Sequence, residues 1–384
     1  MRTSIKIAKQ MIEDAVKAYL AKDENGNYKM PEIGKMPIYM EGPPGIGKTE
    51  IARQVADKLE IGFKSFSLTH HTRNSLMGLP VIRDLPDGGK YTEYTMSEII
   101  AAVRKCCEKG QKEGILMLDE TNCVSETLRP ILLSFLQTKN IGEYTLPEGW
   151  VILLAGNPRA YNRSARPLDM ALLDRVRKIE VEFDDQVFLD YAKEMHFHPA
   201  IIDYLSANPA YAYVLDTEDG KEETVTARGW ENLSRTLIIY DELGIAVEPE
   251  FVRQFIKSDA VVFSFMDHYT LMNAGCTTQE IDLVLAGLDT SEFEEQCNSL
   301  SERTGILLAD YLVRRIAGHA RSKMPKQRVN QEVTNTFRFL ENLESRIPLE
   351  RFFSMLNKDA EIVSVVVKQK NAEYQRMCRT FLAA

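Results

Sequence analysis

Residues 37–49 read Pro-Ile-Tyr-Met-Glu-Gly-Pro-Pro-Gly-Ile-Gly-Lys-Thr, and this stretch decides the fold. Its apolar start, Pro37–Glu41, predicts a buried strand, and the apolar spacing over Thr49–Leu59 predicts a helix. Gly42–Thr49 between them fits G-x-x-x-x-G-K-[ST], whose glycines let backbone N–H groups curl around phosphate oxygens at a helix N-terminus. We expect Lys48 to reach the β- and γ-phosphates of a nucleotide. The expected binding residues are Gly42, Pro43, Pro44, Gly45, Ile46, Gly47, Lys48, Thr49 and Glu50.

A second set of candidate ligands follows about 70 residues later. Gly114–Glu120 is an apolar run that ends in two carboxylates, as expected of a buried strand that delivers ligands at its carboxyl end. We expect Asp119 to hold Mg²⁺, directly or through water, together with the Thr49 hydroxyl, and Glu120 to orient and deprotonate the attacking water. The next apolar run ends at Asn157, whose amide either fixes that water, touches the γ-phosphate, or is an ordinary turn residue.

The order of apolar patterns predicts a parallel α/β sheet up to about residue 183, followed by helices. The expected strands are Pro37–Glu41, Phe63–Leu68, Ile115–Asp119, Val151–Ala155 and Ile179–Phe183. The expected helices are an opening one from about residue 5 to 20, then Thr49–Leu59, Met96–Lys109, Ser125–Gln137 and Leu168–Arg175. Polar stretches interrupt this order at about 78–94, where Pro86–Gly89 predicts a hairpin turn, and at about 139–149. A further hairpin is expected within 211–227, with its turn near Asp219 and Gly220.

Composition limits the class of protein and its partners. The 384 residues carry 47 basic and 56 acidic side chains, a net charge of −9. This length predicts two or three domains, and an acidic chain disfavours nucleic acid as a partner. Six scattered cysteines without Cys-x-x-Cys spacing predict reduced thiols. Glu13 and Asp14 within the first apolar stretch argue against a signal peptide, and no run approaches the roughly 18 apolar residues of a membrane span. We therefore expect a cytoplasmic protein.

Several segments together resemble the MoxR-type branch of the AAA+ ATPases. These segments are GPPGIGKTEIA, ILMLDE, LRPILLSFLQTKNIG, VILLAGNP, LDMALLDRV and TARGWENLSR, and the resemblance covers about residues 1–280. It implies that Asn157 is the sensor-1 amide and that Arg228 is sensor 2, which reaches the γ-phosphate. It also implies that Arg175 is the arginine finger that one subunit inserts into its neighbour's site. Other arginines close to Arg175 remain candidates for that role, namely Arg163, Arg166 and Arg177.

The resemblance also implies an architecture and a function. The expected fold is an α/β P-loop AAA+ module, a parallel sheet with flanking helices, followed by a helical lid and a helical C-terminal extension. The expected domains are residues 1–186, residues 187–283 with sensor 2, and residues 284–384. The inserts at about 78–94 and 139–149 would face the channel of a ring. The implied activity is MgATP hydrolysis by a homo-oligomer, most simply a hexamer, that remodels or activates a partner protein, in this family often a von Willebrand A-domain protein.

Two alternatives from other classes remain open. The first is a DNA-directed motor or loader, which would use a basic stretch without acidic residues, formed by Arg314, Arg315, Arg321, Lys323, Lys326 and Arg328. Such a stretch is also typical of a solvated helix face. The second is a nucleotide-dependent binding scaffold that hydrolyses ATP scarcely at all. The complete set of expected site residues disfavours the scaffold, since a degenerate module would be expected to lack at least the Glu120 carboxylate.

Overall fold

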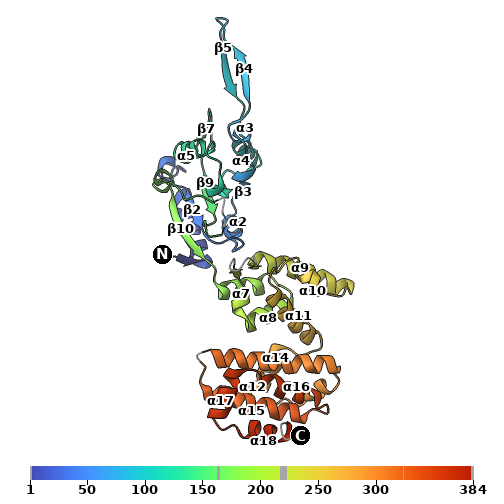
Figure 1. The fold of residues 1–384 in the computed structure, drawn as a ribbon. Coiled ribbons are helices and arrows are strands. Elements are labelled where there is room, and N and C mark those ends of the chain that lie inside the picture. Colours follow the sequence, from blue (N-terminus) through green and yellow to red (C-terminus); the bar gives the residue numbers. More distant parts are fainter. Residues whose placement is uncertain (1, 162–164, 217–222, 323, 382–384) are drawn as a thin grey trace. The chain divides into compact units, whose positions relative to one another are not determined.

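The computed structural model describes residues 2–161, 165–216, 223–322 and 324–381. The chain forms two compact units, the first made of Met1–Asp190 with Thr226–Arg228 and the second of Tyr191–Val225 with Gly229–Ala384. The first sequence boundary between them lies within α7 (Asp185–Glu194). The two units are drawn in Figure 1 and are described separately below.

The first unit contains a six-stranded sheet in which every neighbouring pair of strands runs parallel. In spatial order the strands are β1 (Arg2–Ser4), β10 (Arg177–Glu182), β2 (Ile38–Glu41), β9 (Trp150–Gly156), β6 (Gly114–Asp119) and β3 (Gly62–Ser67). The predicted α/β class and the five predicted strands are confirmed. Edge strand β1 was not expected, because its three residues carry no apolar pattern.

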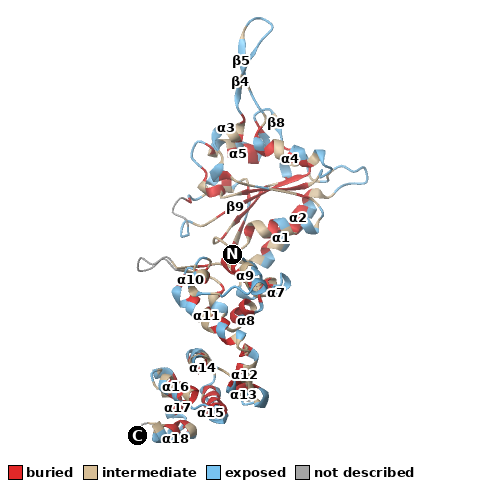
Figure 2. Ribbon diagram, turned by 90° about the vertical axis from the view of Figure 1, so that its right-hand side faces the viewer, coloured by how far each residue is buried: buried red, intermediate tan, exposed pale blue. Residues whose placement is uncertain are grey.

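Helices cover both faces of this sheet, as Figure 2 shows. Alternate side chains of the central strands point to opposite faces. One face packs against α4 (Glu98–Glu108) and α5 (Arg129–Thr138) in a common apolar core. The other face is covered by α1 (Ile5–Leu20) and α2 (Lys48–Lys58), which also contact each other. The shorter helical pieces are η1 (Glu32–Gly34), η2 (Leu68–His70), α3 (Arg73–Met77), η3 (Thr121–Cys123) and α6 (Met170–Leu173).

Two predicted helices are shorter than the apolar pattern suggested. The helix expected over Leu168–Arg175 is only α6, because the Asp169 side chain accepts a hydrogen bond from the Leu172 N–H and so caps the first turn. The helix expected over Ser125–Gln137 begins at Arg129, where a proline in its first turn marks the start.

Two antiparallel hairpins interrupt the α/β order where the sequence predicted polar inserts. The longer one joins β4 (Pro80–Asp84) to β5 (Lys90–Tyr94), and Figure 1 shows it projecting beyond the sheet and its helices. The shorter one joins β7 (Asn140–Ile141) to β8 (Tyr144–Thr145). The long hairpin exposes large apolar side chains, namely Leu79, Ile82, Leu85, Tyr91 and Tyr94. Exposed apolar groups of this kind mark interaction surfaces.

The second unit is mainly helical, as predicted. A small antiparallel pair, β11 (Val214–Asp216) and β12 (Glu223–Val225), matches the further hairpin expected, although its predicted turn at Asp219 and Gly220 lies outside the described residues. The helices are α8 (Pro199–Ala207), η4 (Pro209–Tyr211), α9 (Ala227–Leu243), α10 (Pro249–Val252), α11 (Asp259–Asn273), α12 (Thr278–Ala286), α13 (Ser291–Asn298), α14 (Glu302–Arg321), α15 (Lys326–Asn342), α16 (Ile347–Leu356), α17 (Ala360–Lys368) and α18 (Ala372–Phe381). The predicted boundary at residue 283 falls inside α12, and the division into lid and extension stays a prediction. Among the described residues, none of the helices has the length and apolar character to cross a membrane.

One indole ring is packed tightly where β9, β6 and β3 begin. Trp150, the first residue of β9, is 2% exposed, and its ring lies against the backbone of the neighbouring strand β6 at Gly114 and of β3, the strand beyond it, at Gly62. A methyl group added at Gly114 would lie 2.7 Å from the ring and 2.7 Å from the Gly62 carbonyl oxygen. Neither neighbour is the mobile end of a flexible side chain. The glycines therefore make room for the tryptophan.

We predict that Gly114→Ala lowers the free energy of unfolding of the first unit by about 1–3 kcal/mol, because the added methyl overpacks this contact. The control is Gly318→Ala in α14, where a methyl group would meet no atom within 4 Å. That control should stabilise its own unit by about 0.5–1 kcal/mol, as alanine does in a helix. Urea unfolding curves of the two variants measure both effects, and an unchanged midpoint for Gly114→Ala would contradict the packing account.

Candidate active site

The glycine-rich loop Gly42–Gly47 connects β2 to α2 as the sequence predicted. Gly45 and Gly47 have φ values of +72° and +95°, a left-handed conformation that favours glycine. A methyl group at Gly42 would lie 2.6 Å from the Val181 carbonyl oxygen, and one at Gly45 would lie 2.9 Å from the Thr226 side chain. The loop therefore needs glycine for its curvature and for its close packing. This is the backbone geometry that surrounds phosphate groups at a helix N-terminus.

Lys48 is the first residue of α2 and is 7% exposed. Its ammonium group donates to the carbonyl oxygens of Gly42 (2.8 Å) and Pro43 (2.7 Å) and to Oδ1 of Asn157 (2.8 Å). Burial lowers the pKa of Lys48 to about 8; the nearby carboxylate of Asp119 opposes this shift, and the positive charge of Arg228 adds to it. Lys48 is thus in direct contact with Asn157, which lies 109 positions later in the sequence.

Two hard oxygen donors lie side by side next to this lysine. The Thr49 hydroxyl donates to Oδ2 of Asp119 over 2.8 Å, at the carboxyl end of β6. The other Asp119 oxygen accepts the backbone N–H of Glu120 over 2.8 Å. Magnesium is usually bound in nucleotide sites by one or two protein oxygens plus phosphate and water. The donor set of Thr49 and Asp119 therefore fits Mg²⁺.

Glu120 follows Asp119 in a left-handed conformation, with φ of 56° and ψ of 33°. Its carboxylate accepts hydrogen bonds from the hydroxyls of Ser67 and Thr69, and these bonds lower the pKa of Glu120, so that it is ionised at neutral pH. Sequence reasoning missed both hydroxyls. Ser67 is paired with Asp119 between β3 and β6. The polar residues at the end of the predicted strand Phe63–Leu68 were therefore the sequence feature that could have indicated these hydroxyls.

Asn122 was also missed by sequence reasoning. It lies in the turn after Glu120, is 3% exposed, and donates from Nδ2 to the carbonyl oxygen of Asn157 over 2.6 Å. The sequence offered only an asparagine after two carboxylates, which is not distinctive. The structure therefore brings together Lys48, Thr49, Asp119, Glu120 and Asn157 at the carboxyl ends of β2, β6 and β9.

The candidate arginines have different surroundings. Arg175 hydrogen-bonds the Ala171 carbonyl oxygen (2.6 Å) and Oε1 of Gln137 (3.3 Å). Arg166 pairs with Glu126 and is about half exposed, while Arg177 donates to the hydroxyl of Tyr19 on α1 over 3.2 Å. Arg163 lies outside the described residues. Arg228 is exposed and close enough to Lys48 to influence its pKa.

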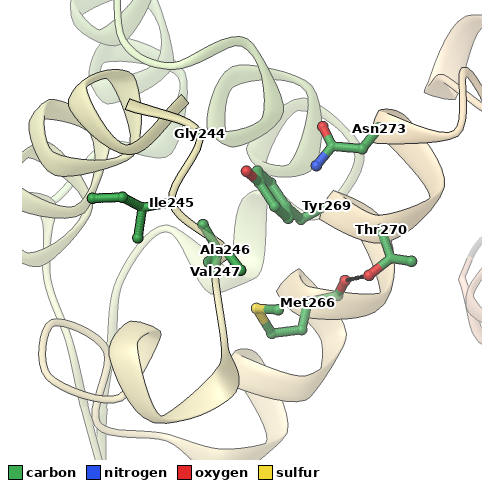
Figure 3. Close-up of a pocket in the computed structure, with 8 residues that line it drawn as sticks. All are labelled: Gly244, Ile245, Ala246, Val247, Met266, Tyr269, Thr270 and Asn273. Carbon is green, nitrogen blue, oxygen red and sulfur yellow. Dashed lines mark hydrogen bonds between the residues drawn. The ribbon is translucent and has the colours of Figure 1, made fainter. Parts of the chain in front are cut away.

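A separate pocket of about 370 Å³ lies in the second unit, between the end of α9 and α11 (Figure 3). It is lined by Gly244, Ile245, Ala246, Val247, Met266, Tyr269, Thr270 and Asn273. None of these residues carries a charged side chain, and the Thr270 hydroxyl is bonded within its own helix to the Met266 carbonyl oxygen. The pocket lacks the cationic and metal-binding groups that a phosphate ligand requires.

Comparison with known proteins agrees with the geometry of the glycine-rich loop. Residues 38–181 match the family described as "ATPase family associated with various cellular activities (AAA)". The chain contains an AAA-family ATPase domain. The matched segment begins at β2 and ends in β10, so this AAA domain includes the loop, both carboxylates and Asn157. Nucleotide binding follows from this family, whereas the MoxR subtype stays a prediction.

Among solved structures, the chain is similar to NtrX from Brucella abortus, which was solved in complex with ADP. The two share 15% sequence identity with a TM-score of 0.35. The match covers 62% of this chain and 51% of the NtrX chain, about half of that protein. A similarity at this level carries no residue roles from NtrX to this AAA domain.

We predict that the affinity of the AAA domain for ADP falls as pH rises above about 8. Lys48 must be charged to bind phosphate, and phosphate oxygens raise its pKa in the complex. Below pH 8 the lysine is already protonated and the affinity is flat; above it, binding takes up a proton and affinity falls by up to about tenfold per pH unit. Isothermal titration calorimetry without added metal between pH 7 and 9.5 measures this.

The matched control is Lys139→Gln. Burial also lowers the pKa of Lys139 to about 8, yet its ammonium group donates to the Leu136 carbonyl oxygen at the end of α5 and not to the loop. The control should show the same pH dependence as the unaltered protein. ADP affinity that stays flat to pH 9 would show that Lys48 does not titrate in the site.

Proposed function

We propose that the protein hydrolyses ATP with Mg²⁺ as a ring-forming ATPase of the MoxR type, and uses the cycle to remodel or activate a partner protein. The observation that carries the proposal is the convergence of Lys48, the Thr49–Asp119 pair, Glu120 and Asn157 at one edge of the sheet. A site for binding alone has no need of an ionised carboxylate beside the metal-binding pair. The proposed division into a nucleotide-binding domain, a lid and an extension goes with this function.

The chemistry follows from the groups in place. In this site Mg²⁺, held by Thr49 and Asp119, would neutralise charge on the phosphate oxygens. Lys48 already points its ammonium group at oxygen acceptors, and phosphate oxygens are stronger acceptors because they carry charge. Glu120 is ionised, since its carboxylate is bonded to two hydroxyls, and is therefore able to orient water and accept its proton. Asn157, which accepts a hydrogen bond from Lys48, would act on the same water or on the γ-phosphate.

Assembly would complete the site. Arg175 follows α6, whose first residue, Met170, is 82% exposed. An exposed methionine at the start of the short helix that precedes a partly exposed arginine suits a surface that meets another subunit. A guanidinium group supplied by a neighbour stabilises the charge that develops during phosphoryl transfer, by about 10³–10⁵ in rate in related enzymes. We therefore propose Arg175 as the arginine finger. The sensor-2 role is proposed for Arg228 on the resemblance given above.

The partner of the ring is proposed to be a protein. The long hairpin β4–β5 presents apolar side chains to solvent, with Ile82 70% exposed and Tyr91 45% exposed. A two-stranded hairpin with exposed apolar groups and unpaired edges is suited to protein contacts. The resemblance stated above suggests a von Willebrand A-domain protein as the partner.

A DNA-directed motor is less well supported. All four arginines of the basic stretch lie on α14 or α15 and are paired with carboxylates, which reduces the positive potential available to phosphate groups. The pairs are Arg314–Asp267, Arg315–Asp282, Arg321–Asp359 and Arg328–Glu332. Stimulation of ATP hydrolysis by DNA, lost when the six basic residues of the stretch are neutralised, would favour this alternative.

We predict that Glu120→Gln binds ATP with nearly unchanged affinity but hydrolyses it at least about 100-fold more slowly, because the amide cannot accept the proton of water. Phosphate release and equilibrium binding of labelled ATP measure the two effects. The control, Glu108→Gln, removes an exposed carboxylate at the end of α4 and should keep the unaltered rate. Equal rates of ATP hydrolysis by Glu120→Gln and by the unaltered protein would refute the role of Glu120 as the group that accepts the proton of water. Normal ATP binding by Lys48→Ala would refute the proposed nucleotide-binding site.

A mixing experiment tests whether Arg175 acts between subunits. Arg175→Ala and Glu120→Gln should each be nearly inactive alone, whereas mixtures should recover part of the activity. Recovery is expected because a Glu120→Gln subunit can donate its intact Arg175 to the intact carboxylate of its neighbour. The control mixes Arg175→Ala with a chain that carries both Arg175→Ala and Glu120→Gln. No subunit in this mixture has an arginine at position 175, so no activity should be recovered. Absence of recovery at every ratio of the single variants would remove Arg175 from the trans role.

A further inference from the structure

The turn after Glu120 places one buried amide beside the strand that ends in Asn157. The left-handed conformation of Glu120 reverses the chain into η3, where the Cys123 N–H donates to the Glu120 carbonyl oxygen over 2.9 Å. The Thr121 hydroxyl fastens the same turn to the Leu118 carbonyl oxygen over 2.9 Å. Non-glycine residues in this conformation are costly and occur where surrounding structure holds them. The turn is thus held at both ends around Asn122.

Asn122 binds the backbone of two other segments. Its Nδ2 donates to the Asn157 carbonyl oxygen over 2.6 Å, and its own carbonyl oxygen accepts the Arg166 N–H over 2.9 Å. Gly156 leaves room for the amide, since a methyl group there would lie 2.6 Å from Oδ1 of Asn122 and 2.4 Å from the Tyr39 hydroxyl. With its side chain 3% exposed, Asn122 makes these bonds shielded from water, where they are strongest.

Asn157 is consequently held from two directions. Its backbone is bonded by Asn122, and its side-chain oxygen accepts the Lys48 ammonium group over 2.8 Å. We infer that Asn122 is a positioning residue for ATP hydrolysis: it joins the turn that carries Glu120 to the backbone of Asn157 and to the segment that leads from Arg166 toward Arg175. This inference rests on the proposed function. Asn122 would fix the position of the Glu120 carboxylate relative to Asn157.

The test uses two substitutions in the full chain. Asn122→Asp keeps size and Oδ1 but replaces the N–H donor by an acceptor that faces the Asn157 carbonyl oxygen, and Asn122→Ala removes the amide. We expect kcat to fall by about 10-fold to 100-fold, as when a catalytic group is displaced slightly, while the Kd for ADP changes by less than about threefold. Asn122 variants with kcat equal to that of the unaltered protein would overturn the inference.

A double-mutant cycle separates positioning from general destabilisation. If Asn122 acts through Asn157, then Asn122→Ala should cost little further kcat in a chain that already carries Asn157→Ala. Fully additive losses would overturn the inference. The matched control is Asn335→Asp, since Asn335 is also a buried asparagine that donates to a backbone carbonyl oxygen, that of Leu285, over 2.9 Å. It should lower thermal stability and leave kcat unchanged.

Gly156→Ala perturbs the contact between the Asn122 amide and the backbone at Gly156 without changing Asn122 itself. This variant therefore tests the inference even if the Asn122 variants do not fold. The added methyl should displace the Asn122 amide and reproduce the loss of kcat, non-additively with Asn157→Ala; kcat equal to the unaltered protein would count against the inference. Failure of the proposed function looks different. In that case the unaltered protein itself hydrolyses no ATP, or hydrolyses it no faster than Glu120→Gln.

Discussion

The burial of one ammonium group constrains the rest of the site. Lys48 is removed from water at the start of α2, and a buried cation is costly unless oxygen atoms surround it. Gly42 and Pro43 supply two carbonyl oxygens from the loop itself, and Asn157, just after β9, supplies a third acceptor from a segment far away in the sequence. This lysine therefore binds the loop to the residue that follows β9. Phosphate oxygens would offer charged acceptors in place of neutral ones, which would further stabilise the charged form of the lysine.

This requirement explains why the order of strands matters. With β2 between β10 and β9, and β6 on the other side of β9, the carboxyl ends that carry the loop, Asn157 and the two carboxylates are adjacent. A parallel sheet presents all of these ends at one edge. Trp150 at the opposite end of β9 packs on Gly114 of the neighbouring β6 and on Gly62 of β3, the strand beyond it. This contact holds β9, β6 and β3 together at the end of the sheet opposite the site.

Much of this arrangement could be predicted because the signals are local. The loop Gly42–Thr49 has its own backbone chemistry, and the apolar run before Asp119 predicts a strand end without knowledge of any neighbour. The hydroxyls on Glu120 and the amide of Asn122 could not be predicted in this way. Their roles depend on the β3–β6 register and on a left-handed residue, and neither leaves a pattern in the sequence. Strand β1 was missed for a similar reason, since only pairing with β10 makes three residues a strand.

The surroundings of the arginines extend this argument to assembly. Arg166 is paired with a carboxylate, Arg177 is bonded to α1, and Arg175 is bonded to the carbonyl oxygen of the residue that follows the exposed Met170. Within the first unit, Lys48 and Arg228 are the cations whose charges act on one another at the loop. The net charge of −9 makes a general attraction for polyanions weak, so affinity for a nucleotide must come from these few placed groups. Under the proposed function, the positive charge still needed at the γ-phosphate in the transition state comes from another copy of the chain. Hydrolysis would then depend on assembly, and the bond from Asn122 to Asn157 would hold each site ready for that arginine.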